Sequence, residues 1–100
     1  MTPQDEDMLA GKIITAVCSA FNVTTADLLS PSRHGRLCDA RRAACHLMFE
    51  SGITNARHLA RHINRTYPTV YHHLETHRNI YDYAPKYRRK YESARHSLSL

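Results

Sequence analysis

The clearest hydrophobic pattern lies in residues 54–78, where two short helical repeats follow each other with a break between them. Apolar residues spaced three and four apart mark one face of a helix. The first repeat consists of Ala56, Leu59, Ala60 and Ile63. The second repeat is Val70 and Leu74, and Asn64 between the two repeats tolerates a left-handed backbone better than most residues with a side chain. The pattern therefore predicts two helices joined by a tight turn.

Such a pair is either a helix-turn-helix or an ordinary αα-hairpin with a polar outer face, and the pattern alone leaves both open. The small Ala60 at the expected crossing and the aliphatic Val70 in the second helix suit a helix-turn-helix. In that motif the start of the second helix presents side chains to bases. Here that start carries Arg65, Thr66, Tyr67 and Thr69. Thr66 is a natural helix cap and Pro68 costs little in a first turn, so we expect this helix at about 66–78.

Further amphipathic repeats predict helices on both sides of this pair. The expected helices are 6–22, a short one in 24–30, and 37–51. Thr24 or Thr25 would cap the short helix, Gly52 would stop the long one, and Thr54 would cap the first helix of the central pair.

A turn at residues 80–85 should precede one more helix, in which apolar residues recur at intervals of four and three residues and form a seam along one face. The seam consists of Tyr83, Tyr87, Tyr91, Ala94 and Leu98. Because the spacing is helical, we expect the tyrosines to face the core rather than to stack on bases. The fold class is therefore all-α: a small helical domain with a helix-turn-helix and an extra C-terminal helix. We assign residues 1–100 to a single domain, with a core at 6–79 and a C-terminal helix or tail at 80–100.

Charge is unevenly distributed along the chain. Residues 1–40 carry a net charge of −2 and residues 41–100 a net charge of +7, and seven of the eight histidines lie in the second part. A basic half on a small domain favours a polyanionic partner, of which nucleic acid is the usual one. The loop SPSRHGR (residues 30–36) adds Arg33 and Arg36, which could clamp phosphate or enter a minor groove, although a solvated linker has the same composition. Arg41 and Arg42 could meet a DNA backbone or solvent.

Several other function classes are disfavoured by composition. The chain has no apolar run near the ~18 residues of a membrane span, and its acidic start is atypical of a signal peptide. Three cysteines without metal-finger spacing favour a reduced, cytoplasmic setting, nucleoid-associated if the partner is DNA. Those cysteines lie in helical stripes with no matched general base, so we expect no enzyme.

Histidine is abundant enough for metal binding to be considered. His58 with His62, and His73 with His77, are spaced i, i+4 and could each hold one ion from a helix face. Zinc would need further ligands, and no H-E-x-x-H or C-x-x-C motif accompanies the pairs. We therefore expect no metal and no other cofactor, and histidines that face solvent or phosphate.

The order of elements also resembles a known family. Residues 23–47, VTTADLLSPSRHGRLCDARRAACHL, align without a gap to the start of the C-terminal DNA-binding domain of the bacterial chromosomal replication initiator DnaA, V-T-V-E-D-L-L-S-K-S-R-K-R-E-V-V-R-A-R-Q-I-A-M-Y-L. The shared positions include Val23, Thr24, Asp27, Leu28, Leu29, Ser30, Ser32, Arg33, Ala40, Arg41, Ala44 and Leu47. With the helix-turn-helix, the likeness covers roughly residues 10–78. It implies a DNA-binding fold and favours the helix-turn-helix over the plain hairpin.

The resemblance also implies roles for particular residues. Arg33 stands where the family places an arginine in the minor groove, and Arg36 keeps part of the basic loop. The family's major-groove segment, G-G-R-D-H-T-T-V, corresponds to residues 64–70, N-R-T-Y-P-T-V, one residue shorter. Its aspartate, histidine and first threonine are replaced by Thr66, Tyr67 and Pro68. The resemblance thus implies a retained scaffold with an altered base-reading surface. The initiator's ATPase is not expected, because three glycines cannot form a phosphate-binding G-x-x-x-x-G-K-[ST] loop here.

We therefore predict double-stranded DNA binding through a recognition helix at about 66–78 and a basic loop at about 31–36, in a small replication or transcription regulator. The predicted DNA-binding residues are Arg33, Arg36, Arg41, Arg42, Arg65, Thr66, Tyr67, Thr69 and His72. The alternative is an adaptor domain that keeps the fold without specific DNA readout. Its protein partner, or a second copy, would dock on the tyrosine-bearing last helix. No membrane partner is expected.

Overall fold

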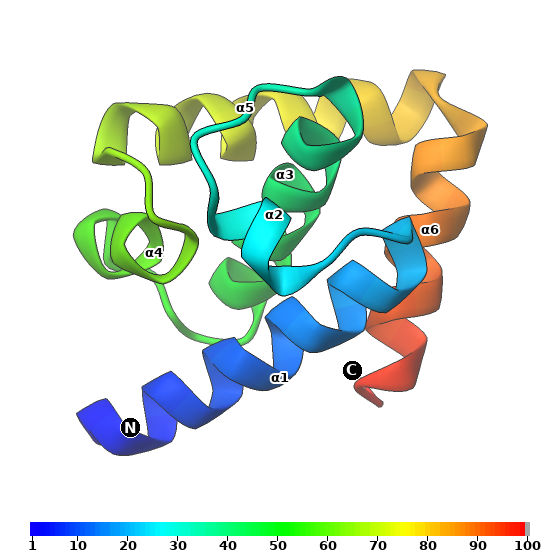
Figure 1. Ribbon diagram of the computed structural model, residues 1–100. Helices are drawn as coiled ribbons and strands as arrows, with labels where there is room; N and C mark the ends of the chain where they lie inside the picture. Colours follow the sequence, from blue (N-terminus) through cyan, green and yellow to red (C-terminus); the bar gives the residue numbers. More distant parts are fainter. Residues whose placement is uncertain (100) are drawn as a thin grey trace.

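A computed structural model describes residues 1–99, which form six helices and no strand (Figure 1). The helices are α1 (Pro3–Phe21), α2 (Thr25–Leu29), α3 (Gly35–Glu50), α4 (Ala56–Ile63), α5 (Tyr67–Tyr83) and α6 (Pro85–Ser97). The predicted all-α class is confirmed, and so is the helical pair of the central segment. No helix within residues 1–99 is both long and apolar enough to cross a membrane.

Local sequence signals set most helix ends. Thr24 caps α2, because its hydroxyl accepts a hydrogen bond from the backbone N–H of Asp27 at 3.0 Å. Asn64 ends α4 in the left-handed conformation (φ 55°), as the break in the hydrophobic pattern predicted. The predicted cap at Thr54 is wrong: Asn55 caps α4, and its side-chain oxygen accepts from the N–H groups of Arg57 and His58. Asparagine is among the best residues for this role.

The C-terminal part of the chain departs from the predicted turn at 80–85. Helix α5 continues to Tyr83, and the chain breaks only at Ala84, because the following Pro85 disfavours helical backbone in the residue before it. Tyr83 consequently belongs to α5 and is 85% exposed, so its predicted place in the apolar seam is wrong. Tyr87, Tyr91 and Ala94 of α6 are buried as expected.

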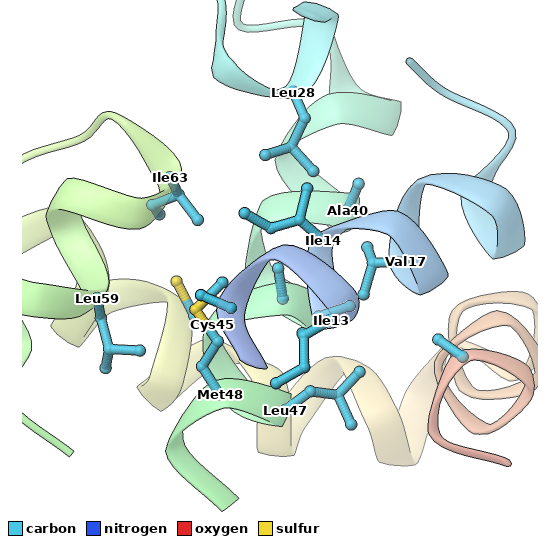
Figure 2. Close-up of a cluster of buried hydrophobic side chains, with 14 of the residues drawn as sticks. Ile13, Ile14, Val17, Leu28, Ala40, Cys45, Leu47, Met48, Leu59 and Ile63 are labelled. Atoms are coloured by element: carbon cyan, nitrogen blue, oxygen red, sulfur yellow. The ribbon is translucent and has the colours of Figure 1, made fainter. Parts of the chain in front are cut away.

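The hydrophobic core is centred on α3, which packs against α1, α4 and α5. Figure 2 shows Ile13, Ile14 and Val17 of α1 directed toward the α3 side chains. The α3 contribution includes Ala40, Cys45, Leu47 and Met48, and Leu28, Leu59 and Ile63 complete the cluster from α2 and α4. Helix α6 packs on α1 and also contacts α5 (Figure 1). The outer faces of α2, of the loop after it and of the N-terminal half of α5 lie outside this core and form a surface of their own.

Two of the histidines expected at the surface are buried. His77 stacks on His46 with ring centroids 3.7 Å apart, and its Nδ1 lies 2.7 Å from the hydroxyl of Tyr87. His73 is 5% exposed. The pKa of each of these two histidines is lowered to about 4, mainly because burial disfavours the charged imidazolium and partly because of the charge of neighbouring Arg42. Buried imidazoles of this kind are neutral packing groups, so the prediction that all histidines face solvent or phosphate is wrong for His73 and His77.

Candidate nucleic-acid interface

The basic loop between α2 and α3 is held by one buried guanidinium. Arg41, on α3, is 1% exposed, although arginine is seldom fully buried without partners. Its three nitrogens donate to four backbone carbonyls at 2.7–3.1 Å, those of Asp27, Leu28, Ser30 and Ser32. Two of these carbonyls, those of Asp27 and Leu28, belong to the last turn of α2, where helix carbonyls lack intrahelical partners. Arg41 therefore fixes the path of the loop, and its side chain is turned into the protein.

The turn of the helix-turn-helix is joined to the same loop. Arg65 donates to the carbonyls of Ser30 and Ser32, and the side-chain amide of Asn64 donates to the carbonyl of Leu29 at 3.0 Å. These partners are more than thirty residues apart in sequence. The loop after α2 and the turn that leads into α5 are thus joined by hydrogen bonds, and Figure 1 shows the loop rising from α2 toward α5.

The side chains that remain free on this surface come from both parts. Arg33 and Arg36 are exposed on and beside the loop, and Thr66, Tyr67 and His72 are exposed on α5 or its cap. Thr69 is half-buried and its hydroxyl lies 3.2 Å from that of Thr66. We call the set Arg33, Arg36, Thr66, Tyr67, Thr69 and His72 the loop–helix surface.

A hollow of about 420 Å³ lies where the loop meets α5. It is lined by Arg33, Cys38, Arg41, Arg42, Arg65, Thr69, His72 and His73. Four guanidinium groups around one hollow give it a positive potential, which attracts anionic groups such as phosphate. The Nδ1 atom of His73 is buried beside it, without a hydrogen-bond partner within residues 1–99. The N-termini of α3 and α5 add the partial positive charge of helix ends on either side.

Three of the predicted site residues, the buried Arg41 and Arg42 and the half-buried Arg65, use their N–H groups within the protein. Arg41 and Arg65 are engaged by the loop carbonyls. Arg42 is 8% exposed, donates to Thr76 Oγ1 at 2.9 Å and pairs with Asp39 Oδ1 at 2.7 Å. The three arginines keep their positive charge near the loop–helix surface, while their N–H groups are used to build it.

Two exposed groups that border the loop–helix surface were not predicted from the sequence motifs. Tyr71 is 59% exposed one turn after Tyr67, and the two rings meet edge to face with centroids 6.3 Å apart. The guanidinium of Arg57, on α4, lies 4.7 Å from the centroid of the Tyr67 ring in a cation–π contact. The i, i+4 spacing of the tyrosines could have shown that they share a face. Only the fold brings Arg57 to them.

Comparison with known proteins agrees with the geometry over two thirds of the chain. A family model described as the bacterial DnaA protein helix-turn-helix matches residues 10–76. That range runs from α1 into α5 and includes the loop and every residue of the loop–helix surface. No curated protein and no solved structure gave a significant match.

Proposed function

The chain belongs to the bacterial DnaA helix-turn-helix family, and from this membership we propose that it binds double-stranded DNA through the loop–helix surface. The observation that carries this proposal is the link from Arg65 to the loop carbonyls of Ser30 and Ser32. It holds a basic loop and the start of a recognition helix in one fixed relation. A protein that reads a major groove with a helix and the adjacent backbone or minor groove with a loop needs that relation.

In this proposal the exposed side chains contact three different parts of the DNA. Thr66, Tyr67, Thr69 and His72 lie on the first turns of α5 or its cap and face the base edges of the major groove. Arg33 enters the minor groove, where the negative potential of A·T-rich sequence attracts arginine. Arg36 contacts a phosphate.

The three inward-facing arginines act indirectly. Arg41, Arg42 and Arg65 position the loop and the helix and supply long-range attraction for phosphate, without direct base contact. The start of α5 has lost the acidic and imidazole groups of the family segment and has gained a phenol and Pro68, which has no backbone donor. The bound sequence therefore differs from the initiator's own box in its major-groove core and keeps an A/T-rich flank.

The biological role that follows is that of a small regulator of replication or transcription, acting by occupying a DNA site. The family's helix-turn-helix domain is not catalytic, and we propose a binding function for this chain as well. Docking of a partner on the tyrosines of the last helix finds little support, because Tyr87 and Tyr91 are 4% and 2% exposed.

Selection of sites from a random pool of duplexes tests the proposal. We expect enrichment of a single motif with an A/T-rich flank and a core unlike the initiator box. The variant Val70→Ala, altered at a fully buried anchor of α5, serves as a control for loss of structure. Failure to enrich any motif from wild-type protein, or recovery of the initiator's own box as the strongest site, contradicts the proposed change in base reading.

A further inference from the structure

A cluster of potential metal ligands that is not part of the loop–helix surface lies where the start of α1 meets α4. The carboxylate of Glu6 places Oε1 3.0 Å from His58 Nδ1 and Oε2 2.9 Å from His62 Nε2. Asp7 Oδ1 lies 3.9 Å from the same His62 nitrogen. Ligand atoms of Glu6, Asp7 and His62 all lie within 4.8 Å of one another. The i, i+4 histidine pair on α4, which lacked further ligands in the sequence pattern, thus meets two carboxylates.

The spacing of these atoms fits the first coordination shell of a small divalent ion. Zinc binds imidazole nitrogen and carboxylate oxygen at about 2.0–2.2 Å in tetrahedral geometry, which sets neighbouring ligand atoms roughly 3.3 Å apart. The observed separations from His62 Nε2, 2.9 Å to Glu6 and 3.9 Å to Asp7, bracket that value. Coordination of one ion by all three ligands would require the Asp7 carboxylate to move closer to His62 than the observed 3.9 Å.

The site is half-enclosed, which separates it from an ordinary surface charge cluster. The side chains of His62 and Glu6 are 10% and 14% exposed, whereas that of Asp7 is open to solvent. Two carboxylates also balance the charge of a divalent ion. His58 is outside this group of three ligands, but its Nδ1 lies 3.0 Å from the other carboxylate oxygen of Glu6 and on the same face of α4 as His62, so it is the nearest candidate for a fourth ligand.

We propose that Glu6, Asp7 and His62 bind one divalent transition-metal ion, with His58 as the fourth ligand and zinc as the ion that best suits the set. Imidazole ligands disfavour magnesium and calcium, which prefer oxygen donors alone. The ion joins the N-terminal turns of α1 to the first helix of the helix-turn-helix. Because the four ligands come together only in the folded chain, the bound ion stabilises the fold.

The main competitor for the two carboxylates is a neighbouring guanidinium. Arg61 Nη2 lies 3.6 Å from both Glu6 Oε2 and Asp7 Oδ1, and the side chain is 62% exposed. An exposed arginine can leave the carboxylates at little cost. Replacement of Arg61 by a neutral residue therefore distinguishes two possibilities. A metal site should bind its ion more tightly, whereas a cluster held only by ion pairs should lose one contact and gain no affinity for metal.

Titration of the metal-free full chain with zinc chloride tests the proposal. Calorimetry measures the number of ions bound per chain, and thermal unfolding shows whether zinc binding stabilises the fold. Cobalt serves as a spectroscopic probe, because tetrahedral coordination gives visible absorption. We expect one ion per chain, a thermal midpoint that rises with zinc concentration, and tighter binding by Arg61→Gln. Loss of a direct ligand in His62→Gln should weaken binding by at least the roughly 10- to 100-fold that loss of an outer-shell partner costs.

Asp7→Asn provides a second ligand variant whose exposed side chain leaves folding intact, and it should also weaken binding. His96→Gln, on exposed surface of α6, is the matched control and should bind zinc as the wild-type chain does. The proposal is overturned by the absence of saturable binding. It is equally overturned if Asp7→Asn and His62→Gln bind as tightly as His96→Gln, since the zinc would then sit elsewhere.

Discussion

Arg41 and Arg65 donate hydrogen bonds to the same two carbonyl groups, those of Ser30 and Ser32. Arg41 reaches them from α3 and Arg65 from the turn between α4 and α5. Two like charges converge there, and burial together with the charge of Arg65 lowers the pKa of Arg41. The shared carbonyls offset this repulsion and couple the loop to the recognition helix. The two arginines are therefore expected to have unequal effects on stability and on binding.

Replacement of Arg41 should mainly affect stability. Arg41→Met keeps much of the side-chain volume but removes four hydrogen bonds, and the bonds from Arg65 to Ser30 and Ser32 replace them only in part. We expect the free energy of unfolding to fall by about 2–4 kcal/mol. Arg41→Lys should recover little of this loss, since an ammonium group cannot reproduce the planar fork. Urea unfolding followed by circular dichroism measures both variants. A loss below about 0.5 kcal/mol for Arg41→Met would show that the loop does not depend on these bonds.

Replacement of Arg65 should affect binding more than folding. Arg65 is only half-buried, and Arg65→Ala removes bonds to the loop at a cost of about 1 kcal/mol in stability. Duplex affinity should fall more than this, because the loop and α5 would no longer be held together. Fluorescence anisotropy with the folded variant, compared with its thermal midpoint, separates the two effects. Unchanged affinity in the folded variant would mean that the link between loop and helix is irrelevant to DNA.

The sequence predicted those parts of the fold that depend on short spacing. The left-handed Asn64, the Thr24 cap and the buried Val70 all follow from residues within one or two turns. The role of Arg41 could not be read in this way, since its acceptors lie 9 to 14 residues earlier and are backbone atoms. The prediction for Tyr83 is wrong because the spacing of the tyrosines is helical on both sides of Pro85, although Pro85 ends one helix and begins the next.

The same distinction holds for the candidate site. The exposure of Arg33 and Tyr67 could be predicted, because a loop composition and a helix start mark exposed positions. The contact of Arg57 with the Tyr67 ring depends on how α4 crosses α5 and has no signature in spacing. The burial of His73 and His77 likewise depends on packing against α3 and α6. Histidine has too little preference for either environment to predict this from sequence.

Stability should depend on pH through His73 and His77. Both have a pKa of about 4 in the folded chain against an ordinary value of 6.5, so folding favours their neutral forms. Their contribution to the free energy of unfolding is complete above about pH 6.5. It is lost as the pH falls toward 4, on the order of 2 kcal/mol for each histidine. Urea unfolding between pH 7.5 and 5 should therefore show falling stability, with a smaller slope in His77→Asn. The exposed His96→Asn should keep the wild-type slope, and an equal slope in all three proteins would rule out this source of pH dependence.

Base preference should depend on the hydroxyl of Tyr67. Tyr67→Phe keeps the aromatic contact with Arg57 and removes one hydrogen-bonding group. If that group meets a base edge, discrimination at one base pair should decrease by ~1–3 kcal/mol while affinity for unrelated duplexes stays unchanged. Competition binding against single-substitution duplexes measures this. Tyr71→Phe, one turn further along the same face, is the matched control, and identical profiles for the two variants would assign no reading role to Tyr67.

The central claim is that duplex DNA is bound by the loop–helix surface, and the salt dependence of binding tests it most directly. Arg33, Arg36 and Arg57 are exposed arginines at or beside this surface that have no carboxylate partner among the described ion pairs, unlike Arg61. If each offsets the charge of about one phosphate, with Arg33 doing so from within the minor groove, log K should fall against log salt with a slope of about −2.7, from −0.9 per phosphate. The double variant Arg33→Ala, Arg36→Ala should reduce the slope to about −0.9. The charge-matched variant Lys12→Ala, Arg89→Ala, altered at exposed sites on α1 and α6, should leave it near −2.7. No binding at low salt, or equal slopes for the two double variants, would contradict the claim.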